Sequence, residues 1–146
     1  MFSLFEHVSE GSDLYRHQVA PVCRRYNLTY MEFTVLMFLA NNPQYDTAAQ
    51  IVRMRRLTKS HVSVSLRRLQ ERGLVEGVYF PGNKKKLHLR VTEAAQEIVE
   101  TGRQTQRAFA EKLLRGFSPE EREQMRNLLT RIYQNMKWEE ENHATQ

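Results

Sequence analysis

The chain has 146 residues, enough for about one domain of ordinary size, and 40% of them are apolar, so it can form a core. No apolar run approaches the roughly 20 residues of a membrane span, Glu6 stands where a signal peptide has a basic flank, and the single Cys23 excludes an internal disulfide, so we expect a cytoplasmic protein. The net charge of +5 is unevenly spread: residues 53–90 hold eleven Lys and Arg against two Glu, a net +9, and the rest of the chain carries −4. A cationic centre of this kind indicates a polyanionic partner.

The N-terminal part of the chain predicts two helices. Apolar residues recur at spacings of three and four over residues 12–26, residues 2–8 can extend this helix backwards, and Pro21 predicts a kink or a break near its end. Thr29 and Glu32 form a capping-box pattern at the start of the second helix. The second helix is apolar nearly all round, which predicts burial, and an Asn-Asn-Pro sequence ends it.

Two further helices follow closely. Asp46 or Thr47 is expected to cap a short helix that ends near Met54. After a turn, Thr58 is expected to cap a longer helix that runs to Arg72. The longer helix has an apolar inner face and a glycine at the position of a left-handed C-terminal cap: Val62, Leu66, Leu69 and Gly73.

The apolar period then changes from that of a helix to that of a strand. Residues 74–80 and 87–91 are predicted to form two strands of a hairpin. Its predicted tip is residues 81–86, which begin with Pro-Gly-Asn and end with three lysines. Three like charges repel one another in a tight loop, so a structural role does not account for them, whereas a phosphate backbone or a minor groove would relieve the repulsion.

Two helices complete the chain. Thr92 opens one that runs to about Arg115, and Ser118 caps the last one, with Pro119 at its first helical position. The tail after Trp138 is polar and is expected to fray. The last helix carries an apolar stripe that needs a partner: Met125, Leu128, Leu129, Ile132 and Met136.

The order short helix, turn, helix and hairpin is typical of a helix-turn-helix that reads duplex DNA. In that motif the N-terminal part of the second helix meets base edges in the major groove. Here that part carries small, polar or cationic residues. The candidate DNA contacts are Thr47, Thr58, Lys59, Ser60, His61, Ser63, Val64, Arg67, Asn83, Lys84, Lys85 and Lys86.

Three local motifs occur in a specific order. They are Asn-Leu-Thr-Tyr-Met-Glu-Phe at 27–33, Leu-Thr-Lys-Ser-His-Val-Ser at 57–63 and Leu-Arg-Arg-Leu-Gln-Glu-Arg-Gly-Leu-Val at 66–75. Through them the chain resembles, over about residues 14–137, the MarR family of bacterial winged helix-turn-helix transcriptional regulators. The resemblance implies a mainly α fold with a small β-hairpin wing. It also implies a winged helix-turn-helix domain at 29–92 and a helical dimerisation region formed by residues 1–28 and 93–146.

The chain departs from the family pattern at the wing and at the preceding turn. Asn83 and Lys85 stand where the family has an Asp-x-Arg pair, which favours gripping of phosphates over reading of the minor groove. Arg55 and Arg56 stand where the family more often has a Leu and a Gly, and they are either phosphate contacts or an exposed turn.

The resemblance further implies a homodimeric repressor that reads a pseudo-palindrome and is released by a small aromatic or anionic effector. Candidate effector contacts are Tyr15, Arg16, His17 and Tyr45. The alternative is a winged helix that binds a partner protein without DNA, which requires an exposed apolar patch on helix 58–72. Neither a catalytic constellation nor metal-ligand spacing of the histidines is present in the sequence, so we expect no enzyme, metal or cofactor, and we expect Cys23 to be inert core.

Overall fold

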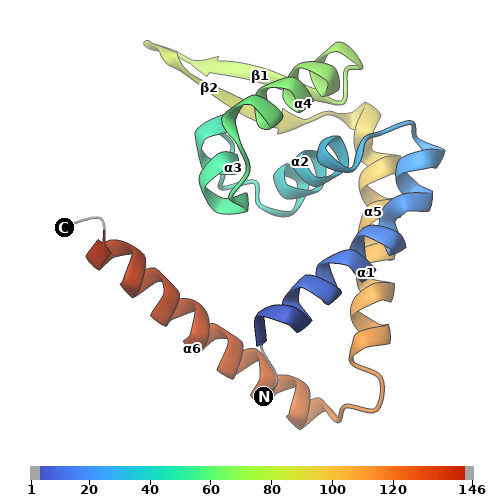
Figure 1. The fold of residues 1–146 in the computed structure, drawn as a ribbon. Helices are drawn as coiled ribbons and strands as arrows, with labels where there is room; N and C mark the ends of the chain where they lie inside the picture. Colours follow the sequence, from blue (N-terminus) through green and yellow to red (C-terminus); the bar gives the residue numbers. More distant parts are fainter. Residues whose placement is uncertain (1–3, 144–146) are drawn as a thin grey trace. The chain divides into compact units, whose positions relative to one another are not determined.

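The computed structural model describes residues 4–143, except the side chains of residues 4–6 and 9 (Figure 1). The elements are α1 (Leu4–Arg25), α2 (Tyr30–Asn41), α3 (Ala48–Arg55), α4 (Lys59–Glu71), β1 (Val75–Phe80), β2 (Asn83–Val91), the 3-10 turn η1 (Glu93–Ala95), α5 (Gln96–Leu113) and α6 (Pro119–His143). They divide into two compact units, Met1–Phe109 and Ala110–Gln146. The predicted mainly α fold with one β-hairpin is confirmed.

Helix α1 is longer than its apolar repeat suggested. It extends backwards to Leu4, as expected for residues 4–8, whereas residues 2 and 3 lie outside the described part of the chain. Of the kink or break predicted at Pro21, the break is wrong, because the helix continues through it to Arg25. Val19, Val22 and Cys23 are buried on both sides of the proline, and this burial offsets the one backbone hydrogen bond that a proline removes.

Helix α2 forms the centre of the first unit. Its predicted capping box is confirmed: the Thr29 amide donates to the Glu32 carboxylate at 2.9 Å, and the Glu32 amide donates to the Thr29 hydroxyl at 3.0 Å. Residues 32–39 are all buried. On one side, Gly102 of α5 lets the two helices approach closely, since a Cβ there would lie 2.6 Å from the Met37 sulfur.

Helices α3 and α4 are joined by a tight turn. Thr47, not Asp46, caps α3, and Gln50 returns the capping interaction. Arg56 then takes a left-handed conformation (φ 51°), and the Thr58 hydroxyl accepts the His61 amide at the start of α4. The predicted inner face of α4 is confirmed, because Val62, Leu66 and Leu69 are buried. The predicted glycine cap is also confirmed, since Gly73 has a left-handed φ of 70°.

Strands β1 and β2 form an antiparallel hairpin. The predicted six-residue tip is wrong, because β2 begins at Asn83 and includes the three lysines. Gly82 takes a left-handed φ of 79°, so the turn closes with Phe80 opposite Asn83. The register then breaks: Tyr79 pairs with Leu87, so residues 84–86 have no partner on β1.

The second unit begins in the last turn of α5 and contains α6. Ser118 and Glu121 form a capping box at the start of α6, and Arg122 bonds Glu111 and the Leu114 carbonyl. The predicted fraying after Trp138 is wrong for residues 139–143, which remain helical. The side-chain amide of Asn142 donates a hydrogen bond to the Trp138 carbonyl in the last turn. No helix within residues 4–143 is long and apolar enough to cross a membrane.

The capping box of α2 yields a prediction about stability. Glu32→Ala is expected to lower the free energy of unfolding by about 1–2 kcal/mol, because the Thr29 amide at the start of the central helix loses its hydrogen bond to the Glu32 carboxylate. Urea denaturation measures the effect. Glu32→Gln is the control: Gln can return the cap, as Gln50 does in α3, and it loses the charge that pairs with the half-exposed Arg68 guanidinium at 3.5 Å. A Gln variant as unstable as the Ala variant would show that charge, and not capping, is what matters here.

Candidate nucleic-acid interface

The first turns of α4 present a polar row to solvent. Burial of the inner face of α4 leaves the opposite face free, and side chains there are small, polar or cationic. Val64 is the one large apolar side chain exposed on α4, at 39%. The exposed residues are Thr58, Lys59, Ser60, His61, Ser63, Val64 and Arg67, all of them sequence-predicted contacts.

Thr47 is the exception among the predicted contacts. It is only 5% exposed, and its hydroxyl accepts the Gln50 amide and donates to the Gln50 side-chain oxygen. The threonine is therefore occupied as a helix cap, and we leave it out of the candidate interface.

The hairpin carries the second part of the candidate interface. Its closed end projects away from α2, α3 and α4 (Figure 1). Lys84, Lys85 and Lys86 are all exposed there. The Asn83 side chain accepts the Lys85 amide at 3.1 Å, which fixes the start of β2. The hairpin thus presents three cations on a backbone that is held locally.

A contact that the sequence did not indicate fastens this hairpin to the helices. The Leu89 amide donates to the Asp46 carbonyl at 2.7 Å, and the His88 Nδ1 lies 2.9 Å from the Asp46 carboxylate. Asp46 directly precedes the cap of α3, so the hairpin and the helix-turn-helix share one anchor. Sequence reasoning considered Asp46 only as a cap, because nothing local marks a pair 42 residues apart.

Some of the basic residues counted in the sequence serve the fold instead. Arg72 donates to the backbone carbonyls of Asn27 and Tyr26 at 2.9 and 2.8 Å. Arg68 pairs with Glu32, and Arg90 pairs with Glu76. The cationic surface is accordingly narrower than the +9 segment, and it centres on the start of α4 and on β2.

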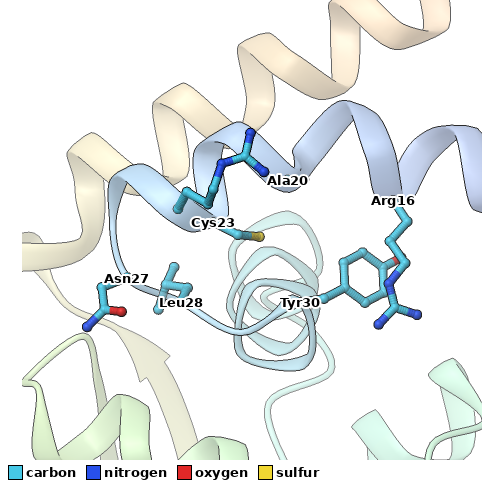
Figure 2. A pocket seen from close by; sticks show the side chains of 7 residues that line it. Arg16, Ala20, Cys23, Asn27, Leu28 and Tyr30 are labelled. Atoms are coloured by element: carbon cyan, nitrogen blue, oxygen red, sulfur yellow. The ribbon is translucent and has the colours of Figure 1, made fainter.

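The four candidate effector contacts do not form one site. Arg16 lines a cavity of about 400 Å³ and lies 4.6 Å from the centre of the Tyr30 ring (Figure 2). Tyr15 lines another cavity, of about 260 Å³, where it accepts a hydrogen bond from Gln106. Burial raises the pKa of Tyr15 above its ordinary value. His17 bonds the Asp13 carbonyl and Tyr45 stacks on Phe38, and neither lines these two cavities.

Cys23 faces the larger cavity (Figure 2). It is buried, and this burial raises the pKa of its thiol, although the nearby Arg24 charge acts in the opposite direction. A thiol with a raised pKa stays protonated near neutral pH and is a poor nucleophile, which supports its reading as inert core.

The thiol provides a testable pH dependence. Because its pKa is raised, the alkylation rate of Cys23 by iodoacetamide is expected to reach half its maximum at a higher pH than for a cysteine peptide. Mass spectrometry of native protein quenched at set times after addition of iodoacetamide measures the alkylation rate at each pH, and the unfolded protein is the control. A midpoint below that of the peptide would instead reveal a thiolate stabilised by the arginines and would support a redox role.

The arrangement of α3, α4 and the hairpin defines the class of DNA-binding fold. Two helices joined by a tight turn, with a two-stranded hairpin directly after the second helix, form a winged helix-turn-helix. Residues 26–84, which include this motif up to the start of β2, match the model of the MarR family. The winged-helix region therefore belongs to the MarR family, and the resemblance found in the sequence is confirmed.

Solved structures share the fold over most of the chain. A MarR family transcriptional regulator from Listeria monocytogenes, solved with a 26mer DNA, matches with a TM-score of 0.83 and 18% identity, covering 93% of this chain and 90% of that one. MarR itself matches with a TM-score of 0.76 and 21% identity, covering 92% and 91%. The MepR–DNA complex of S. aureus matches with a TM-score of 0.74 and 19% identity, covering 92% and 99%. No curated protein matches the sequence.

Proposed function

We propose that this chain is a sequence-specific regulator of transcription that binds double-stranded DNA as a homodimer. The observation that carries the proposal is the pairing of the polar, exposed start of α4 with three exposed lysines on the adjoining hairpin. Two of the structures that share the fold, from L. monocytogenes and S. aureus, contain DNA. The shared anchor at Asp46 keeps the two parts of the interface in one module.

In the proposed mode of binding, α4 lies in the major groove. Ser60, Ser63 and Arg67 are exposed on the face opposite the core and can bond base edges, while Val64 suits the methyl group of thymine. Lys59 lies in the first turn, where phosphates are within reach. Lys84–Lys86 follow the phosphate backbone beside the same site.

The proposed homodimer rests on the exposed apolar stripe of α6. Leu128, Leu129 and Met136 are each more than half exposed, and Ile132 lies between them on the same helical face. A stripe of this size on a helix in water is expected to pack against another apolar face. Two copies would place two α4 helices on half-sites about one helical turn apart.

We further propose that the regulator is a repressor released by a small aromatic or anionic molecule. The two cavities beside α1 and α2 have volumes of about 400 and 260 Å³, adequate for a small molecule, and each has an arginine in its lining: Arg16 and Arg55. A ligand that favours one spacing of the two α4 helices over another would shift the population away from the DNA-competent form.

The alternative, a winged helix that binds a protein partner instead of DNA, requires an apolar patch on α4. Only Val64 is exposed there among the large apolar residues of the described helix. One valine among lysine, serine, histidine and arginine is not such a patch, so the surface of α4 favours DNA.

DNA binding is expected to depend steeply on salt. A duplex selected by the wild-type protein from a random pool should bind with a log K that falls linearly with log[salt], because each neutralised phosphate releases counterions. Lys59→Ala and Lys85→Ala should each weaken binding and reduce the magnitude of the slope by about 0.9. Fluorescence anisotropy titrations at salt concentrations from about 50 to about 300 mM measure K and hence the slope of log K against log[salt].

Lys112→Ala, a change of the same charge outside the interface, is the control for these two variants. Binding by the wild-type protein that hardly responded to salt would contradict the proposal. A strongly sequence-selective loss in Lys85→Ala would contradict its assignment to the backbone.

The dimer can be tested on α6. Ile132→Glu places a charge in the apolar stripe, so the variant is expected to sediment as a monomer at micromolar concentrations at which the wild-type protein is a dimer. Gln134→Glu adds the same charge to α6 outside the stripe and should leave the dimer intact. Equal sedimentation of the Ile132→Glu variant and the wild type would exclude this stripe as the interface.

A further inference from the structure

The end of β1 exposes two large rings beside the turn of the hairpin. Tyr79 is 53% exposed and Phe80 is 54% exposed, although both are aromatic and belong to the same unit as a well-formed core. They lie at the closed end of the hairpin, which projects from the helices (Figure 1). Two adjacent exposed rings are a candidate contact surface, and their surroundings decide which partner they suit.

The two rings are held differently. Phe80 stacks on His88 with 3.9 Å between ring centroids and 12° between planes, and His88 in turn pairs with Asp46. Tyr79 directly precedes Phe80 in the strand, so it lies on the other face, opposite Leu87. In the part of the chain that the structure describes, the Tyr79 hydroxyl has no hydrogen-bond partner. Phe80 therefore stiffens the hairpin, and Tyr79 is left available.

The neighbours of Tyr79 are cationic. The register break between Tyr79 and Phe80 leaves the three lysines unpaired on the facing strand, next to Leu87, the partner of Tyr79. A ring and three ammonium groups thus share one end of the hairpin. An inorganic anion would use the lysines alone, whereas a nucleic acid offers phosphates to the lysines and apolar sugar and base surface to the ring.

We propose that Tyr79 is a direct DNA contact of the wing, with its ring packed against sugars and base edges in the minor groove while the lysines bind the flanking phosphates. This inference rests on the proposed function. It fits the anchoring of the hairpin: Asp46 joins β2 to the cap of α3, so the ring stands in a fixed relation to the start of α4. A membrane or an acidic protein would not need that relation.

The experiment separates the ring from the charges. On the duplex selected by the wild-type protein, Tyr79→Ala is expected to raise Kd about tenfold and to leave the slope of log K against log[salt] unchanged, because no cation is removed. Tyr79→Phe, which keeps the ring, should stay within about twofold of the wild type. Lys85→Ala should instead change the slope. Netropsin, which fills A·T minor grooves, should compete with the wild type more strongly than with Tyr79→Ala.

The outcomes distinguish the two proposals. Salt-dependent binding by the wild type with equal affinity for Tyr79→Ala would overturn the role of the ring and leave the proposed function standing. Failure of the wild type to bind any duplex would overturn the proposed function itself. Binding to anionic phosphatidylserine vesicles that Tyr79→Ala abolishes, with DNA affinity unchanged, would assign the ring to a membrane and overturn the inference. Thermal unfolding of each variant, expected to match the wild type because the ring is exposed, excludes misfolding.

Discussion

Helix α2 is buried around its whole circumference, and the other elements of the first unit are arranged around this constraint. Residues 32–39 have no solvent-facing side, so α1, α4 and β2 must all pack against the helix. Gly102 of α5 completes the cover by removing a side chain where Met37 lies. Because α4 gives its apolar face to this packing, its polar face is the one that remains outside. The candidate interface is thus a consequence of how the core is closed.

The helix ends and the exposed face of α4 could be predicted because short sequence patterns determine them. The Thr29–Glu32 capping box, the Thr58 and Ser118 caps and the left-handed Gly73 are short patterns with a single physical meaning, and each occurs where the sequence indicated it. The exposure of the start of α4 followed from its apolar period. These features needed no knowledge of what lies across the core.

The features that the sequence did not predict depend on contacts between residues far apart in the chain. The continuation of α1 through Pro21 depends on burial against partners distant in sequence, which outweighs a local penalty. The start of β2 at Asn83 depends on a register break, and three lysines carry no strand preference that could reveal it. The Asp46–His88 pair and the separation of Tyr15 from Arg16 are likewise set by tertiary structure. Composition also overstated the cationic surface, because Arg68 and Arg72 bond the protein itself.

Two of the places where large apolar side chains are exposed have different surroundings, and these surroundings distinguish what each can bind. On α6, Leu128, Ile132 and Met136 recur at helical spacing and form a stripe along one face, which suits the matching stripe of a second copy. On β1, Tyr79 stands beside a break in pairing that exposes three lysines, and burial of those ammonium groups against an apolar partner would cost more than the ring could return. A partner for the wing must therefore supply anions around an apolar surface, and a DNA groove does both within one structure. The contrast supports the proposed self-association through α6 and the proposed nucleic-acid contact of the hairpin on physical grounds that do not depend on the family.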